Sequence, residues 1–338
     1  MHVTLRSKLE DMKKRVAIIA GGNSGEYEVS INSAKMVLSV TDPNLYEAYI
    51  VIIKGNSWYV EYENQQLTID KSDFSFQLNN TKQHFDVVYN IIHGTPGEDG
   101  IIQGYFELLG LPLVGPDILN CALTMNKLVS KKLAAAFDIP VAKAVTKHKH
   151  ESIDYDAITS ITGYPCFLKP NNGGSSVATY KIKEKAQFPA ALADVFKHDH
   201  TAIFEEFIEG VEVACGVFEK NGELICLPIT EIVPHNEFFD YAAKYEGAST
   251  EITPARLPEA THKRLNELTK KLYRILECKG MVRVDFIVKG DTPYLLAANT
   301  IPGFSPASLI PQQIRAAGLT EKEVITYLIE EKLKQYAK

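Results

Sequence analysis

The sequence predicts an α/β protein, α+β in parts, that is divided into several domains. Apolar runs and helical patterns alternate in the first third in the order of βαβ units, which form parallel sheets. A small mixed region comes next, and short strands then follow one another through a third, β-rich region. At 338 residues the chain is too long for one core of ordinary size, so we expect two or three domains.

The composition is that of an ordinary globular protein and argues against several functional classes. Hydrophobic residues make up 45% of the chain, but no apolar run approaches the roughly 20 residues of a membrane span. The net charge is −6 and the basic residues are scattered, which argues against a nucleic-acid partner. The five cysteines never occur as C-x-x-C, so neither a zinc site nor a disulfide framework is indicated, and a reducing cytoplasm fits. Residues 1–11 lack the apolar core of a signal peptide.

The first domain is expected to be a parallel sheet with functional loops at the carboxyl ends of its strands. One apolar run ends at Gly21-Gly22 and a later one at His93-Gly94, so both pairs should lie at that edge. Turn residues at 111–116 end the domain. We expect strands at 16–20, 46–53 and 87–92, and helices at 30–40 and 101–109.

The rest of the chain is expected to contain a small mixed region, a β-rich region and a final helix. Residues 236–253 are polar and aromatic without a clear period, which predicts a long loop. The last helix is amphipathic and begins with a capping box formed by Thr320 and Glu323. Between these landmarks we expect a helix at about 125–137 and apolar strands at 203–208, 211–218 and 224–229.

The segment Lys169–Val177 predicts a nucleotide clamp. A lysine closes an apolar strand there, and a loop with two glycines and two serines follows. Glycine lets backbone N–H groups approach a polyphosphate, while lysine and serine supply charge and donors. A plain surface turn is the alternative for such a loop taken alone.

Two strands at 282–288 and 294–299, joined by a turn, predict a hairpin that could hold a metal. Strict alternation places Arg283 and Asp285 on one face of the first strand, and Leu295, Ala297 and Asn299 on one face of the second. A carboxylate beside an amide oxygen suits Mg²⁺, and Arg283 could grip a phosphate or an oxyanion. A solvated hairpin edge is the alternative.

Two loops of the first domain could bind a substrate. The segment 93–100 holds three glycines and leads into a helix, whose free N–H groups bind anions, while His93 could orient a substrate. The segment 22–30 adds Glu26 and Glu28, either of which could hold an ammonium group. A capped turn and helix-capping acids are the alternatives.

The long loop is expected to act as a lid, because Lys244 lies between two tyrosines and could reach a phosphate as the loop closes. An exposed loop with tyrosines packed on the surface is the alternative. Two histidine pairs, His148 with His150 and His198 with His200, lie in charged segments and are interpreted as solvated surface.

Taken in order, these segments resemble the D-alanine–D-alanine ligases of the ATP-grasp superfamily, from Val16 to the final helix. The matching motifs are Gly21–Ser30, His93–Gly100 with Gln103-Gly104, Met125–Lys127, Lys169-Pro170 with Gly174–Val177, Phe239–Tyr245, Val282–Asp285, Asn299–Gly303 and Ser308-Leu309. The resemblance implies an ATP-grasp fold with nucleotide held between the last two of three domains. These domains are 13–116 for substrate binding, 117–206 as the central subdomain, and 207–338 with the metal and catalytic residues.

The resemblance also implies a role for each candidate residue. Near the first substrate, Glu26 would hold its ammonium group, Ser175 and Tyr245 would form a hydrogen-bonded group beside it, and His93 would contact substrate. Arg283 and the backbone of Gly303 would stabilise the tetrahedral intermediate, while Ser308 and Leu309 would take the carboxylate of the second D-alanine. For ATP the candidates are Lys127, Lys169, Ser176 and Lys244 at the phosphates, Glu205, Glu206 and Ile208 at adenine, and Glu212 at the ribose.

The implied reaction is the ATP-dependent ligation of two D-alanines through an acyl phosphate, for peptidoglycan synthesis. Asp285 and Asn299 would bind Mg²⁺ or Mn²⁺, and the family uses two such ions. Phosphoryl transfer needs positioning and charge neutralisation more than a covalent catalyst, which agrees with a site rich in lysine, arginine and metal ligands. Family members are commonly dimers, so a homodimer is implied, in addition to ATP and D-alanine as partners.

One position departs from the family pattern in a way that bears on activity. The family has a glutamate two residues before Asn299 that bridges both metal ions, and this chain has Ala297 there. Since metal charge is a large part of transition-state stabilisation, we expect reduced activity in an altered variant or a natural homologue. Asn126 and Leu113 are smaller departures, at positions where aspartate and tyrosine are common.

Two other functions stay open from the sequence. The chain could be a nucleotide-binding homologue that has lost efficient catalysis through Ala297. It could also be a ligase that joins D-alanine to D-lactate, although Tyr245 argues against that activity because depsipeptide-forming relatives usually carry another residue there.

Overall fold

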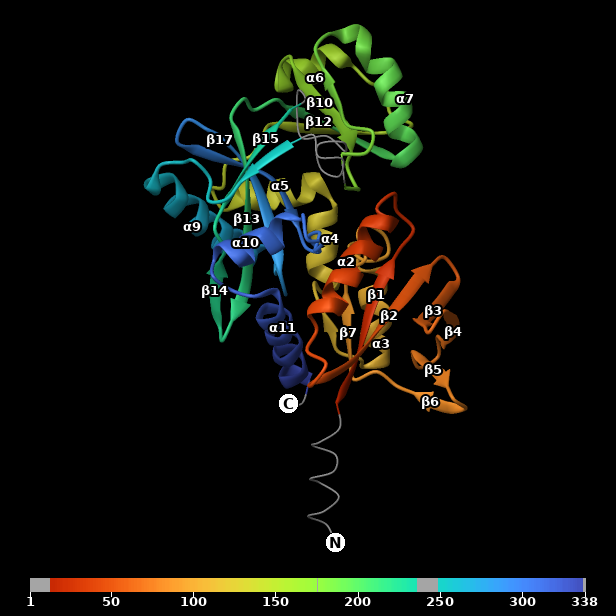
Figure 1. The fold of residues 1–338 in the computed structure, drawn as a ribbon. Coiled ribbons are helices and arrows are strands. Elements are labelled where there is room, and N and C mark those ends of the chain that lie inside the picture. Colours follow the sequence, from red (N-terminus) through yellow and green to blue (C-terminus); the bar gives the residue numbers. More distant parts are fainter. Residues whose placement is uncertain (1–12, 175, 236–248, 337–338) are drawn as a thin grey trace. The chain divides into compact units, whose positions relative to one another are not determined.

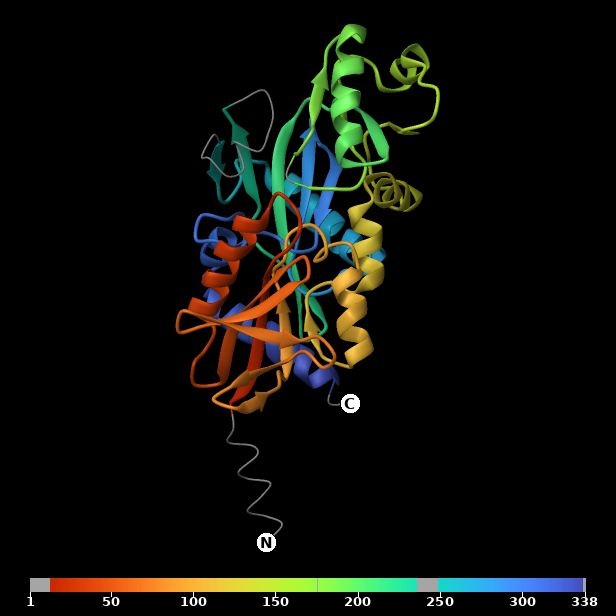
Figure 2. The same ribbon diagram turned by 90° about the vertical axis from the view of Figure 1, so that its right-hand side faces the viewer.

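The computed structural model describes residues 13–174, 176–235 and 249–336, which belong to two compact units (Figures 1 and 2). The first unit consists of the chain up to Gly115 together with Gly303–Pro311 and Gly318–Lys338. The second unit consists of Pro116–Pro302 and Gln312–Ala317. Within the described ranges, no helix is both long and apolar enough to cross a membrane.

The first unit is built on an eight-stranded sheet in the order β6-β5-β4-β3-β2-β1-β7-β8. The neighbours β2, β1, β7 and β8 are parallel, as the βαβ pattern predicts. Residues 57–83, for which no strand was expected, extend the sheet as an antiparallel meander. The strands are β1 (Lys14–Gly21), β2 (Tyr46–Lys54), β3 (Ser57–Tyr62), β4 (Gln65–Asp70), β5 (Ser75–Leu78), β6 (Thr81–Gln83), β7 (Val87–Asn90) and β8 (Leu113–Val114).

Among the described residues, the helices that lie wholly within the first unit are α2 (Tyr27–Val40), α3 (Ile101–Leu109) and α11 (Glu321–Tyr336). The α3 bounds confirm the prediction, and its positive-φ glycine at Gly110 ends the helix. The capping box before α11 is also present, because Thr320 and Glu323 exchange side-chain bonds with each other's backbone N–H groups. Helix α11 packs against α2, β7 and β8.

The second unit contains two antiparallel sheets. A four-stranded sheet has the order β11-β10-β12-β9 and packs against α6 (Tyr155–Thr162) and α7 (Phe188–His198), which follows the short helix η1 (Lys185–Gln187). A six-stranded sheet has the order β16-β15-β13-β17-β18, with β14 paired to β13. The strands are β9 (Ala144–His148), β10 (Cys166–Pro170), β11 (Tyr180–Ile182), β12 (Thr201–Glu206), β13 (Val211–Lys220), β14 (Glu223–Cys226), β15 (Thr230–Pro234), β16 (Ser249–Ile252), β17 (Val282–Lys289) and β18 (Thr292–Asn299).

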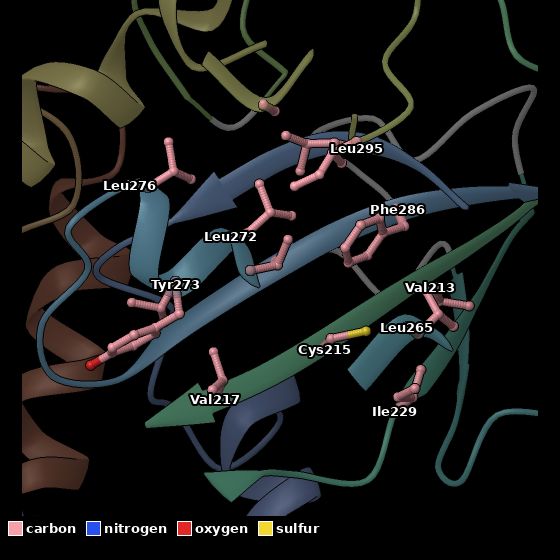
Figure 3. Packing of buried hydrophobic residues seen from close by; sticks show 14 of the residues in the cluster. Val213, Cys215, Val217, Ile229, Leu265, Leu272, Tyr273, Leu276, Phe286 and Leu295 are labelled. Carbon is pink, nitrogen blue, oxygen red and sulfur yellow. The ribbon is translucent and has the colours of Figure 1, made fainter. Parts of the chain in front are cut away.

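One hydrophobic core of the second unit lies between the six-stranded sheet and α9 (Glu259–Ile275), and another lies between the four-stranded sheet and its helices. Helix α9 buries a stripe at helical spacing that includes Leu265 and Leu272, although the helix is polar on its other side. These side chains pack against alternate residues of β13 and against Phe286 of β17 (Figure 3). Packing of this kind leaves the opposite face of the sheet for polar side chains.

Two expectations about these elements need correction. The single helix expected at 125–137 is two helices, α4 (Ile118–Met125) and α5 (Lys127–Ala136), separated by Asn126. The Asn126 side chain accepts from the N–H of Val129 and so caps α5, a task that aspartate performs equally well. The long loop expected at 236–253 is wrong for Ser249–Ile252, which form β16 at the edge of the sheet, while 236–248 lie outside the described residues.

The domain boundaries expected from the sequence stay a prediction. By compactness the break falls after Gly115, close to the expected end of the first domain, but the chain's last helix belongs to the same unit as its first strand. The assignment of residues 207–338 to one domain does not allow for a final helix that belongs to the first unit. The sequence shows that α11 has an apolar side, but it cannot show which surface that side packs against. In the structure the buried residues of α11 are Val324, Ile325, Leu328 and Ile329.

Candidate active site

In the first unit, the loops that follow β1 and β7 are held together at the carboxyl edge of the sheet. Ser30 of α2 makes the link, because its hydroxyl accepts from Gly21 N at 2.9 Å and donates to Ile91 O at 2.7 Å. Gly21 has φ +100°, a conformation that glycine adopts readily, so the chain can turn sharply into the 22–30 loop. Strand order and local geometry thus place both predicted loops at one edge.

Glu26 and the His93-Gly94 segment lie close together in this edge. Ser24 donates to the carbonyl of His93 at 2.7 Å, and Glu26 N donates to Ser24 at 3.2 Å. A methyl group added at Gly94 would lie 3.6 Å from Glu26 Oε2, which shows how near the carboxylate is to the backbone. The structure therefore brings these candidates together, while their roles stay predictions.

The 93–100 loop is rigid, and Glu98 serves the loop itself. Its carboxylate accepts from Gly94 N at 2.7 Å, across the turn. Gln103 and Asn90 both donate to the carbonyl of Gly97, at 2.6 and 3.0 Å. This network supports the alternative in which the loop acids have a local structural task, and it fixes the backbone around His93.

The segment Gly303–Leu309 forms a compact turn that belongs to the first unit. Ser308 accepts from Ser305 N at 2.9 Å and bonds the Ser305 hydroxyl at 2.8 Å. A side chain at Gly303 would meet the Ser308 hydroxyl at 3.1 Å, so glycine keeps the approach to this backbone open. Leu309 is buried and begins α10 (Leu309–Ala316).

In the second unit, three buried charges connect α5, β10 and β12. Glu205 lies between Lys131, at 3.1 Å, and Lys169, with which it also forms an ion pair. Lys131 further donates to the carbonyl of Leu295 in β18 at 3.2 Å. Two cations share one carboxylate, so the ionised group carries one excess positive charge next to the predicted phosphate loop.

The electrostatics of this buried group follow from burial and charge. Burial alone would raise the pKa of Glu205, but the two lysines outweigh it and lower that pKa to about 2. Burial lowers the pKa of Lys131, and the positive charge of Lys169 lowers it further, while Glu205 opposes both. Lys131 was not among the expected site residues, and a lysine at helical spacing gives no sign of being buried.

The loop after Lys169 is anchored at its base to the start of α5. Asn171 accepts from Lys127 N through its carbonyl and from Leu128 N through its side chain, both at 3.0 Å. The Lys127 ammonium donates to the carbonyl of Gly173. Lys127 and Lys169 therefore both lie at the base of this loop, which agrees with a phosphate clamp. Ser176 lies within the loop and has φ +57°.

The remaining nucleotide candidates lie along β12 and the start of β13. Glu206 is half-buried and its carboxylate accepts from Lys143 N at 3.3 Å, while Ile208 follows the end of the strand. Glu212 is paired with Ile287 and Ile232 in the six-stranded sheet. Three further candidates, Ser175, Lys244 and Tyr245, lie outside the described residues.

The predicted hairpin is confirmed, but its register is not the one that strict alternation gives. Arg283 pairs with Asn299 and Asp285 with Ala297, so these four residues share a face. A bulge then shifts the register, and Phe286 pairs with Leu295. The expectation that Leu295 shares the face of Ala297 is therefore wrong. Leu295 instead packs in the hydrophobic core near Phe286 (Figure 3).

The metal candidates are each bonded by a protein group. Asp285 is nearly buried, and Arg283 donates to both of its oxygens at 2.8 Å. Asn299 Oδ1 accepts from Ile301 N at 3.1 Å. Among the described residues no group of three or more His, Cys, Asp or Glu side chains is arranged to hold a metal ion.

Sequence reasoning missed Glu251, a carboxylate of β16 on the same face of the sheet. It pairs with Ile232, which pairs with Glu212, and so faces the side that carries Asp285. Burial raises the pKa of Glu251, while its bond from Gln312 at 2.6 Å and the charge of Arg283 act in the opposite direction. The alternation of β16 is too short to reveal this, because only four residues are paired.

Comparison with known proteins identifies the family. Residues 15–116 match the model for the D-ala D-ala ligase N-terminus, and residues 133–330 match that for the C-terminus. A D-alanine--D-alanine ligase of Phocaeicola vulgatus is 45% identical over 323 residues, which is 95% of this chain and 100% of the relative.

Solved structures agree in fold. The VanG D-Ala:D-Ser ligase of Enterococcus faecalis is 33% identical with a TM-score of 0.84, over 95% of this chain and 100% of that one. The D-alanine--D-alanine ligase of Bacillus anthracis, in complex with ATP, is 30% identical with a TM-score of 0.76, over 96% and 99% of the two chains. The predicted ATP-grasp fold is thereby confirmed, and the chain belongs to the D-alanine–D-alanine ligase family.

Proposed function

We propose that this chain uses ATP to join two D-alanines into D-alanyl-D-alanine, a precursor of peptidoglycan. The observation that carries the proposal is the cation-rich base of the 169–177 loop, where Lys127 and Lys169 flank a backbone able to receive phosphate. Glu26, close to the backbone of Gly94, supplies the acid that a substrate ammonium needs. The second substrate would be bound through Ser308 and the N–H groups of its turn.

The proposed reaction has two steps, a phosphoryl transfer and the formation of the peptide bond. The carboxylate of the first D-alanine attacks the γ-phosphorus of ATP, so an acyl phosphate forms and ADP leaves. The amine of the second D-alanine then attacks the acyl carbon, loses a proton and expels inorganic phosphate. Arg283 would stabilise the oxyanion of the tetrahedral intermediate, and Lys169 would neutralise phosphate charge as it shifts toward ADP.

The donor set fits one Mg²⁺ better than two. Asp285 and Asn299 offer oxygen ligands on one face, and Mg²⁺ is usually completed by substrate phosphates and water. Bound there, Mg²⁺ or Mn²⁺ would neutralise charge on the phosphates. Ala297 lies directly opposite Asp285 and offers no ligand atom, so the bridging carboxylate of a second ion has no counterpart in the hairpin.

The decisive experiment is phosphate release with Mg-ATP and D-alanine, with the product identified by mass spectrometry. D-Alanyl-D-alanine and phosphate in equal amounts are expected, at a slow rate. ATP binding without any product would favour the alternative of a nucleotide-binding homologue that has lost catalysis. D-Lactate and D-serine should be offered as second substrates, because one structural neighbour is a D-Ala:D-Ser ligase.

The Ala297→Glu variant tests the metal argument. Restoring a carboxylate opposite Asp285 should raise the rate about a hundredfold or more and lower the Mg²⁺ needed for half-maximal activity. Ala297→Gln is the matched control, since it adds similar volume without the charge. Equal gains in both variants would show that the added charge is not the cause, and no gain in either would mean that another residue already serves as the bridge.

A homodimer in the cytoplasm is the proposed setting. Helix α3 exposes Ile101 to 64% and Leu108 to 89%, seven residues apart and thus on one side, which suits a covered apolar contact. None of the five cysteines forms a disulfide, which suits a reducing compartment. Sedimentation should show a dimer that Leu108→Lys weakens; a wild-type monomer would refute the assignment.

A further inference from the structure

A buried hydroxyl links three segments of the first unit that the reaction would use. Ser33 of α2 is fully buried, and it lies between His93, which is 3% exposed, and Phe304, which is 2% exposed. The N–H of Phe304 donates to Ser33 Oγ at 3.1 Å. Ser33 Oγ also lies 3.3 Å from His93 Nε2. Phe304 directly follows Gly303, whose backbone is assigned to the tetrahedral intermediate.

The direction of the two bonds follows from the protons that each group carries. An amide N–H can only donate, so the Ser33 hydroxyl is an acceptor toward Phe304. The hydroxyl keeps its own proton, and because Ser33 has no contact with solvent that proton needs a buried acceptor. Nε2 of a neutral imidazole is such an acceptor when the ring proton is on Nδ1.

We propose that Ser33 is a positioning residue that holds neutral His93 as the Nδ1–H tautomer and fixes the peptide after Gly303. The inference rests on the proposed function and refines it. With its Nε2 lone pair engaged by Ser33, His93 does not take the proton of the attacking amine at that atom; it contributes as a donor through Nδ1–H. The Ser33 hydroxyl thereby connects the loop that carries His93 to the turn that would bind the second substrate.

The tautomer can be observed directly, without any catalytic turnover. In the full chain labelled with ¹⁵N-histidine, two-bond proton–nitrogen correlations distinguish Nδ1–H from Nε2–H rings, and His93→Gln identifies the His93 signals. The wild type should show the Nδ1–H pattern for His93, and Ser33→Ala should lose it. Ser30→Ala is the matched control, because Ser30 is equally buried on the same helix but bonds Gly21 and Ile91.

Kinetics give the second readout. Ser33→Ala should raise the KM for the second D-alanine about five- to tenfold with little change in the KM for ATP, as expected for a lost hydrogen bond. Ser33→Thr keeps the hydroxyl and should restore both the tautomer and the KM, while circular dichroism establishes that each variant is folded.

An Nε2–H pattern for wild-type His93 would overturn the inference, as would a Ser33→Ala variant with unchanged tautomer and unchanged D-alanine kinetics. A wild-type protein that releases no phosphate with D-alanine would instead refute the proposed function. The histidine spectra would then still decide the role of Ser33, so the two failures are distinguishable.

Discussion

Replacing Glu205 by Gln should destabilise the second unit strongly, because two buried lysines would lose their shared counter-ion. The side chains of Lys131 and Glu205 are each 4% exposed and that of Lys169 is 12% exposed, so water cannot solvate the charges left behind. Removing one partner of a buried pair typically costs about 3–5 kcal/mol. Glutamine keeps the size of the side chain, which isolates the charge from the packing.

The part of this cost that falls on Lys131 has an upper limit. Lys131 can escape the penalty by losing its proton, which for an ordinary lysine at about pH 7 costs about 4.6 kcal/mol, being about 3.4 pKa units at about 1.36 kcal/mol each. At about pH 9 the same limit falls to about 1.9 kcal/mol. In the variant the folded-state pKa of Lys131 lies below its unfolded value, so stability should recover as the pH rises. The wild type, in which Glu205 opposes the lowering of the Lys131 pKa, should show a smaller recovery.

Urea unfolding followed by far-UV circular dichroism at the two pH values measures the free energy of unfolding. Hydrogen exchange at neutral pH locates the change, which should appear in α5, β10 and β12. Glu206→Gln is the matched control on the same strand, because Glu206 is half-buried and accepts one N–H at 3.3 Å; it should cost less than about 1 kcal/mol. Adding Lys131→Met to Glu205→Gln should recover most of the loss. A Glu205→Gln cost no greater than the control's would refute this reasoning.

Three further substitutions test the phosphate clamp, an ion pair of the second unit and the cap of α11. Lys169→Ala should weaken ATP binding about ten- to a hundredfold, measured by calorimetry, and an unchanged affinity would contradict the clamp assignment. Arg256 donates to Glu231 through its side chain at 2.6 and 3.0 Å and lowers the pKa of that carboxyl, so this contribution to stability is present at neutral pH and is lost as the pH falls below about 4. Arg256→Ala should lower the stability slightly at pH 7 but not in acid, since Arg256 is largely exposed, and an equal loss at both pH values would reject the ion pair as its cause. Thr320→Ala should cost the first unit about 1 kcal/mol through the lost cap, read from the fluorescence of Trp58, the chain's one tryptophan; an unaltered midpoint would show that the cap is dispensable.

The sequence was sufficient for features that depend on local pattern. The βαβ order, the α3 bounds and the capping box at Thr320 depend on periodicity and turn chemistry within one segment, and the structure has them. The shared face of Asp285 and Asn299 also followed from alternation near the end of the hairpin. Motif order further allowed the family to be recognised over nearly the whole chain.

Features that depend on pairing between distant segments could not be predicted. The bulge that turns Leu295 into the core depends on how β18 accommodates β17, and no residue type signals it. Glu251 joins the polar face through the register of β16, and Lys131 is buried because Glu205 lies opposite it. Ser33 is one of several serines in its helix, and only tertiary packing sets it between His93 and Phe304.

The discontinuity of the first unit has a consequence for how the protein is made. Its sheet consists of residues that leave the ribosome before the second unit, but α11, which packs on β7 and β8, is synthesised after that unit. Until then, the surface that receives Val324, Ile325, Leu328 and Ile329 is exposed on a nascent chain whose second unit is already complete. We therefore expect the second unit to fold before the first, which reaches its native state only once α11 has emerged. Shortening the chain before residue 321 should yield a protein that aggregates through its N-terminal sheet although most of its sequence is intact.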